Sequence, residues 1–162
     1  MGLNASNLAA TKVQRISDTE VEATRLFDAP PHLVFKAWTT PELFQRWWAP
    51  KSMGVPMHVR ELDVRVGGSY RIEFEAEGGQ IWAFFGKYTD VVPNQRIVWT
   101  NEESGDSGAI SSVTLKEQDG KTLLTFRETY PTKEALDEGI GGTEGLPEQF
   151  GQLEELLGEM AA

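Results

Sequence analysis

Alternation of apolar and polar residues covers most of the chain and predicts β-strands. Between Ser69 and Glu77, Tyr70, Ile72 and Phe74 share one face of such a strand, and charged residues occupy the other. The same pattern predicts strands over residues 12–27, 55–66, 81–92, 96–100, 109–117 and 123–130. Glycine turns separate several of these strands by only a few residues, so neighbouring strands should pair antiparallel.

Helical spacing replaces this alternation between the first two strands and again near the end of the chain. Pro30 and Pro31 suit the first turn of a short helix, because the amide that proline lacks would be unpaired there. Pro41 starts a second short helix, which Pro50 ends. A long amphipathic helix follows near the end, with one apolar stripe made of Leu146, Phe150, Leu153, Leu157 and Met160.

The expected order is a strand, two short helices, further strands and a long C-terminal helix. This order predicts an α+β fold, in which one curved antiparallel sheet of about six to seven strands packs against the long helix. Residues 12–160 are expected to form a single domain. Residues 1–11 are expected to be a flexible leader.

Charge and composition exclude several classes of partner. The formal net charge is −10 over 162 residues, which disfavours binding to nucleic acid or to anionic membranes. No run of about 18 apolar residues is present, so no membrane span is expected. The chain has no cysteine and its start does not resemble a secretory signal, which fits a cytoplasmic protein.

No sequence motif assigns a catalytic residue. The two histidines, His32 and His58, lie far apart without a set of carboxylates, so no metal site is expected. Gly67 and Gly68 precede a strand rather than a helix, which indicates a hairpin turn and not a phosphate loop. No cofactor is expected, and the catalytic residues of an enzyme with this sequence stay unassigned.

Aromatic residues concentrate on the strand and helix faces that are expected to meet. Ligand cavities are mostly apolar with a few placed polar groups, and these faces offer both. The candidate cavity residues are Trp38, Trp47, Trp48, His58, Tyr70, Phe74, Trp82, Phe84, Tyr88, Phe126, Glu128 and Phe150.

Some of these candidates have a structural interpretation as well. Glu128 follows Phe126 on the predicted core face, where an unpaired carboxylate is costly, but it can also reach solvent or pair with an arginine. Alternation places His58 on one face with Leu62, and a lone histidine in a strand is more often structural or exposed than a base. The tryptophans at 47–48 can plug the core instead of lining a pocket.

Four segments resemble a known superfamily: residues 25–50, 62–74, 84–100 and 144–157. The most specific parts are the sequence DVRVGGSYR and the G-x-Y-x-x-V-x-P step of GKYTDVVP. They resemble the START-like, helix-grip superfamily, also called SRPBCC, and within it the homologues of the activator of the heat-shock-protein ATPase. The resemblance extends from about Lys12 to about Gly158.

The resemblance implies a curved sheet that grips the long helix, with a cavity between them. The main hypothesis is that the protein binds a hydrophobic small molecule or a lipid in this cavity. The alternatives are a cyclase or hydrolase that uses Glu128, His58 or Tyr88 as acid or base, and a co-chaperone-like module that binds proteins. Fold alone does not choose among them.

Two further expectations concern the ends of the cavity and the assembly. Similar proteins often carry a bulky aromatic residue near the start of the last helix, where this chain has Leu146 between Gly145 and Pro147. A leucine leaves more room at that end of the cavity. The exposed edge strands of an open sheet also allow a homodimer.

Overall fold

The computed structural model describes residues 10–105 and 108–161. The strands are β1 (Lys12–Arg15), β2 (Glu20–Phe27), β3 (Met57–Leu62), β4 (Ser69–Glu75), β5 (Ile81–Val92), β6 (Arg96–Thr100), β7 (Ile110–Gln118) and β8 (Lys121–Thr129). The α-helices are α2 (Pro31–Thr39), α3 (Pro41–Trp47), α4 (Lys133–Gly139) and α5 (Leu146–Ala161). Short 3-10 helices occur at η1 (Lys51–Met53), η2 (Glu77–Gly79) and η4 (Ile140–Gly145).

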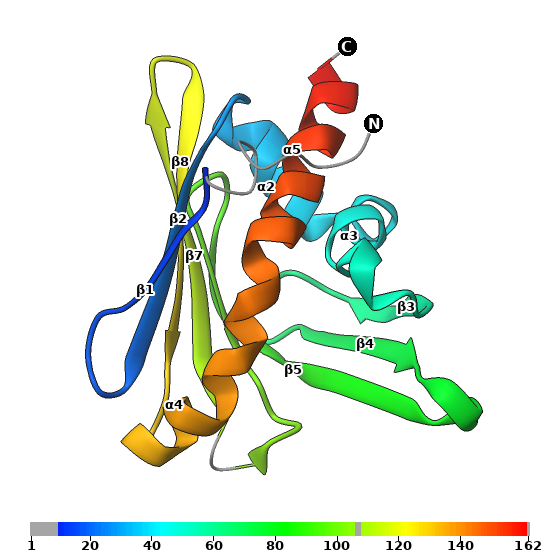
Figure 1. The fold of residues 1–162 in the computed structure, drawn as a ribbon. Helices are drawn as coiled ribbons and strands as arrows, with labels where there is room; N and C mark the ends of the chain where they lie inside the picture. Colours follow the sequence, from blue (N-terminus) through cyan, green and yellow to red (C-terminus); the bar gives the residue numbers. More distant parts are fainter. Residues whose placement is uncertain (1–9, 106–107, 162) are drawn as a thin grey trace.

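The strands form one antiparallel sheet in the order β1-β2-β8-β7-β6-β5-β4-β3. Figure 1 shows α5 crossing one face of this sheet, with the β4–β5 hairpin extending away from the β2–β8–β7 part. The α+β fold, the antiparallel pairing and the long C-terminal helix are therefore confirmed. Within the described residues the sheet has eight strands, instead of the six to seven expected.

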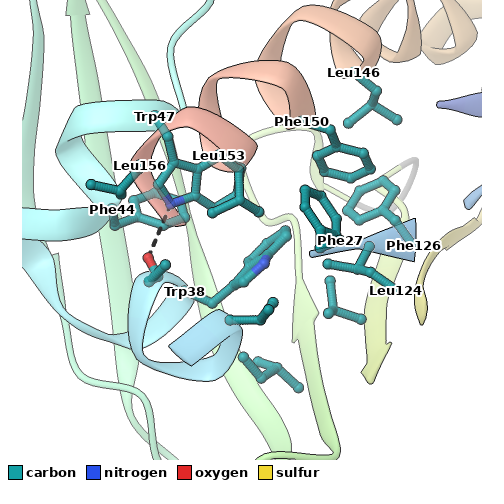
Figure 2. Packing of buried hydrophobic residues seen from close by; sticks show 14 of the residues in the cluster. Phe27, Trp38, Phe44, Trp47, Leu124, Phe126, Leu146, Phe150, Leu153 and Leu156 are labelled. Carbon is teal, nitrogen blue, oxygen red and sulfur yellow. Dashed lines mark hydrogen bonds between the residues drawn. The ribbon is translucent and has the colours of Figure 1, made fainter. Parts of the chain in front are cut away.

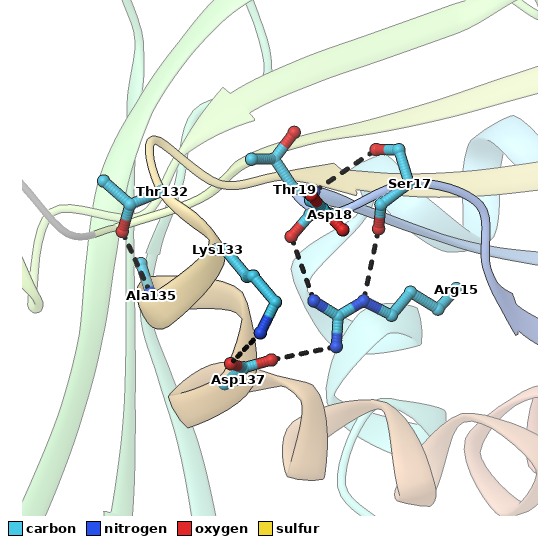
Figure 3. Close-up of polar contacts among 8 residues, drawn as sticks. All are labelled: Arg15, Ser17, Asp18, Thr19, Thr132, Lys133, Ala135 and Asp137. Atoms are coloured by element: carbon cyan, nitrogen blue, oxygen red, sulfur yellow. Dashed lines mark hydrogen bonds and ion pairs between the residues drawn. The ribbon is translucent and has the colours of Figure 1, made fainter.

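The extra strand arises because the segment over residues 12–27 is two strands joined by a tight turn. Ile16 and Ser17 both donate backbone hydrogen bonds to the carbonyl oxygen of Glu20, which reverses the chain. The Arg15 guanidinium donates to the carbonyl oxygens of Ser17 and Asp18 (Figure 3). It also pairs with Asp137 of α4 at 2.8 Å, so this turn is tied to the chain that follows β8.

α5 buries the predicted apolar stripe against the sheet. Leu146, Phe150, Leu153 and Leu157 are at most 3% exposed. Figure 2 shows the Phe150 ring facing Phe27 of β2, and their centroids lie 5.8 Å apart. This stripe forms a continuous apolar core between helix and sheet, which supplies the main stabilising force of the fold.

Two buried glutamines of α5 hold the chain that leaves α3. Gln152 donates its side-chain amide to the carbonyl oxygens of Trp47 and Ala49 and accepts from the backbone N–H of Lys51. Gln149 donates to the carbonyl oxygen of Trp48. Buried backbone groups in an irregular segment need such partners, so these glutamines fix the position of η1 over the sheet.

A β-bulge in β3 changes which side chains face the helices. Met57 and Val59 pair with Phe74 and Ile72 of β4, and the register shifts between Val59 and Glu61. After the shift, Leu62 pairs with Tyr70 and so joins the inner face. The alternation predicted from the sequence placed Leu62 with His58, and the extra residue of the bulge is the reason that it fails.

Candidate functional site

A cavity of about 790 Å³ lies between the inner face of the sheet and the helices. β3, β4, β5, β6 and β8 contribute side chains from the sheet, and α2, α3, η4 and the start of α5 close the other side. Leu146 lines it at the start of α5. The volume falls in the range of pockets that hold small-molecule ligands.

The cavity opens to solvent along β5 and η1. Trp82, Phe84 and Met53 line it, yet they remain 47%, 42% and 42% exposed. Large apolar side chains rarely stay this accessible without a reason when they gather at a concave surface. These three side chains form an apolar rim through which a ligand can enter.

Nine of the twelve predicted cavity residues line this space. They are Trp38, Trp48, Tyr70, Phe74, Trp82, Phe84, Tyr88, Phe126 and Glu128. Four elements, α2, β4, β5 and β8, supply eight of them, and Trp48 follows α3, so their proximity results from the fold and not from sequence spacing.

The structure places the other three predicted residues away from the cavity wall. Trp47 and Phe150 are fully buried in the core, and the Trp47 indole N–H donates to the carbonyl oxygen of Ala37 at 3.0 Å (Figure 2). His58 precedes the bulge of β3 and pairs with Glu75 at 3.4 Å on the outer face of the sheet. It therefore cannot act on a molecule inside the cavity.

A polar network occupies one part of the cavity wall. Ser111 donates its hydroxyl to one Glu128 carboxylate oxygen at 3.3 Å, and Tyr130 donates to the other at 3.2 Å. Asn101 donates to Ser111 at 2.9 Å, and the Tyr70 hydroxyl lies within 3.3 Å of the Asn101 side-chain oxygen. Glu128 is thus positioned by neutral groups from β7 and from the residue that follows β8.

Burial and like charge disfavour ionisation in this network. Burial raises the pKa of Glu128, the hydroxyls of Tyr130 and Ser111 oppose that rise, and the negative charge of Glu103 adds to it. Burial likewise raises the pKa of Tyr70 and of Tyr88. This part of the cavity therefore favours neutral protein groups, and any negative charge on Glu128 lacks a basic partner in the network.

The raised pKa of Glu128 predicts a pH-dependent effect of Glu128→Gln. Between the ordinary pKa of glutamate, about 4.3, and the raised one, the folded state binds more protons than the unfolded state. The contribution of Glu128 to stability thus falls as pH rises through this window, and glutamine removes that loss. We expect the variant's unfolding free energy, relative to wild type, to increase from about pH 4 to about pH 8.

Urea unfolding at several pH values measures this difference. Glu117→Gln removes an exposed carboxylate of β7 and serves as the matched control. A Glu128→Gln difference that stays constant across the range, or that follows the control, would contradict the raised pKa.

Sequence reasoning missed several lining residues. Trp99 faces the cavity from β6, and alternation with Ile97 in the short strand was the available signal. Asn101 and Glu103 line it from the polar loop that follows. No periodic pattern reaches into that loop, so only the fold reveals that it borders the cavity.

Neither a metal cluster nor a membrane-spanning helix is found in the described ranges. No three histidine, aspartate or glutamate side chains in residues 10–105 and 108–161 are grouped so as to hold a metal ion. In the same ranges no helix is long and apolar enough to cross a membrane.

Solved structures with this fold come from several bacteria. A Rhodobacter sphaeroides protein is 22% identical with a TM-score of 0.82, covering 92% of this chain and 98% of its own. A Mycobacterium smegmatis protein is 26% identical, with a TM-score of 0.79 and coverage of 93% and 98%. A Chromobacterium violaceum protein is 28% identical, with a TM-score of 0.73 and coverage of 87% and 98%. These similarities support the fold and name no activity.

No curated protein matches the chain significantly. The family described as Activator of Hsp90 ATPase homolog 1-like protein matches residues 28–158, which is most of the 162-residue chain. The match covers α2, the strands that line the cavity and most of α5. The chain therefore belongs to the Activator of Hsp90 ATPase homolog 1-like family, within the START-like helix-grip superfamily that its sequence resembles.

Proposed function

We propose that the protein binds a hydrophobic small molecule in the cavity between the sheet and α5. The observation that carries the proposal is a cavity of about 790 Å³ with largely aromatic walls and an apolar rim open to solvent. The family itself supports a ligand-binding or helper-domain fold. A lipid is included in the proposed ligand class, and the proposed location is the cytoplasm.

A neutral fluorescent probe, phenylnaphthylamine, tests this proposal. We expect saturable binding of one molecule per chain, because the cavity is large enough for the aromatic body and excludes water from it. Trp82→Ala should weaken binding by about tenfold, since it removes a large apolar contact from the rim. Fluorescence titration gives both affinities.

Ile81→Ala is the matched control for this test. Ile81 and Trp82 are neighbours on β5 and equally exposed at 47%, but only Trp82 lines the cavity. The control should bind the probe like wild type. Absence of saturable binding to wild type, or equal effects of the two substitutions, would reject the proposal.

Acid–base catalysis on the bound molecule is a second candidate function. Glu128 favours it, because it lines the cavity and burial raises the pKa of its carboxyl, which is how enzymes prepare a general acid. Its test is conversion of a bound molecule: Glu128→Gln should abolish turnover while phenylnaphthylamine still binds. Turnover that persists in this variant would remove Glu128 from the mechanism.

The outer face of the sheet offers less support for a protein-binding role. Glu73 of β4 accepts hydrogen bonds from Arg60 and Arg71 there, which makes this part of the face charged and self-paired. Protein-binding surfaces usually have an apolar centre with few charges. A homodimer through the edge strands β1 or β3 stays a prediction.

A further inference from the structure

We propose that the cavity ligand is a hydrophobic organic cation, an amine or quaternary ammonium on an apolar body, whose positive end lies beside Glu128. This inference rests on the proposed function and adds the chemical class of the ligand. It follows from the charge of the cavity wall, from the partners of Glu128, from the row of side chains beside it and from Trp38.

The charged residues that line the cavity are all acidic. They are Glu103, Glu128, Glu138, Glu144 and Glu148, and no lysine, arginine or histidine lines it. None of these five glutamates has an ion pair within the described residues, although ten ion pairs of arginine or lysine form elsewhere in that part of the chain. Such a wall attracts a cation and repels a carboxylate or a phosphate.

Glu128 is the carboxylate best placed to meet a ligand. Its hydrogen-bond partners, Ser111 and Tyr130, are both neutral hydroxyls. A carboxylate in a partly buried site is costly without a positive partner. The negative charge of Glu103 makes ionisation of Glu128 costlier still. An ammonium group at this position would supply the missing charge.

Aromatic rings and a small residue adjoin Glu128 on the same face of the sheet. Tyr88, Trp99, Ser111 and Glu128 are successive cross-strand partners on β5, β6, β7 and β8. Directly opposed residues point to the same face of a sheet. Tyr88, Trp99 and Glu128 all line the cavity, so the carboxylate borders the same space as two rings, whose faces attract cations.

Trp38 provides an independent sign that a ligand completes the site. It lines the cavity and is only 4% exposed, yet its indole N–H has no acceptor among the described residues. Buried donors are nearly always paired, because leaving one unpaired is costly. A ligand atom that accepts this hydrogen bond would satisfy it, so the apolar body should carry an acceptor as well as the cation.

Three compounds with one aromatic body test the charge of the ligand: pyrenylmethylammonium, pyrenylmethanol and pyrenylacetate. Fluorescence titration near neutral pH and low salt should show the ammonium binding at least about tenfold more tightly than the alcohol, because one charge-assisted contact contributes about that much. The acetate should bind more weakly than the alcohol. High salt should reduce the preference for the ammonium.

Substitutions then locate the preference. Glu128→Gln should weaken the ammonium by about tenfold and leave the alcohol unchanged, while Glu117→Gln on the exposed end of β7 should change neither. Glu103→Gln, in the loop after β6, should also weaken binding of the ammonium compound. It provides a second variant should Glu128→Gln fold poorly.

The outcomes separate this inference from the proposed function. Equal affinity for ammonium and alcohol, or tightest binding of the acetate, would overturn the cationic ligand while cavity binding stands. A preference for the ammonium that survives both Glu128→Gln and Glu103→Gln would also overturn the assignment to this wall. Failure of all three compounds and of phenylnaphthylamine to bind would reject the proposed function itself.

Discussion

Trp47→Ala should lower the free energy of unfolding by about 4 kcal/mol, a loss typical of a buried large ring. Trp47 is fully buried, and its ring lies 4.7 Å from Trp38 and 5.4 Å from Phe44 between centroids. Alanine leaves a void among these rings, which the helices cannot easily close. It also leaves the Ala37 carbonyl oxygen without the indole donor.

Trp48→Ala is the matched control, because it makes the same chemical change at the next residue. Trp48 lines the cavity and is only partly buried, so we expect a loss of about 1 to 2 kcal/mol. Trp48→Ala should instead weaken the binding of phenylnaphthylamine. Urea unfolding compares the two, and equal losses of stability would contradict the assignment of Trp47 to the core and Trp48 to the wall.

This pair shows what the sequence could and could not predict. Helical spacing correctly predicted a short helix that ends at these tryptophans, since local patterns determine local structure. Adjacent positions on a helix point about 100° apart, so one tryptophan can enter the core while the next borders a cavity. Which of the two tryptophans enters the core depends on α5, which lies about 100 residues further along the chain.

His58 and the two buried glutamines show the same limit in other ways. A bulge adds one residue to β3 and reverses the faces beyond it, and nothing in the alternating pattern marks that residue. Gln149 and Gln152 lie on a helix whose apolar stripe is clear in the sequence. Their partners are backbone groups of the segment after α3, and only the fold shows that these groups need donors and acceptors.

The predicted faces of β5 were more reliable because that strand is long and its side chains alternate. Trp82, Phe84 and Tyr88 all line the cavity, as alternation predicted. The register of β5 against β6 shifts only after Tyr88, so the shift does not disturb this face. The aromatic face of β5 could therefore be predicted residue by residue, and so could Glu128 of β8. The other four carboxylates of the wall could not, because they lie in a loop or near helix ends.

Gly86→Ala should destabilise the protein by about 3 kcal/mol, because the new methyl group has no room. A Cβ at Gly86 would overlap the carbonyl oxygen of Thr100 and lie 2.8 Å from its carbonyl carbon. Both atoms belong to the backbone of β6, so no side-chain rotation can relieve the clash. Relief requires β5 and β6 to separate where Lys87 and Thr100 are hydrogen-bonded.

The same displacement should reach the cavity. The Thr100 carbonyl oxygen accepts the Tyr70 hydroxyl at 2.7 Å, and Asn101 follows in the network that positions Glu128. Gly86→Ala is therefore expected to weaken phenylnaphthylamine binding as well as stability. Gly158→Ala is the control: its Cβ meets nothing within 4 Å on α5, and alanine should stabilise the helix by about 1 kcal/mol.

If Gly86→Ala lowers the free energy of unfolding while Gly158→Ala raises it, then close approach of two strands, and not the loss of glycine flexibility, determines the effect at Gly86. Its backbone lies outside the left-handed region, so alanine is not strained there by conformation alone. Urea unfolding of both variants measures the two free energies. If Gly86→Ala were as stable as wild type, then β5 and β6 would be further apart than described, and the wall that joins Tyr88 to Trp99 would need a different geometry.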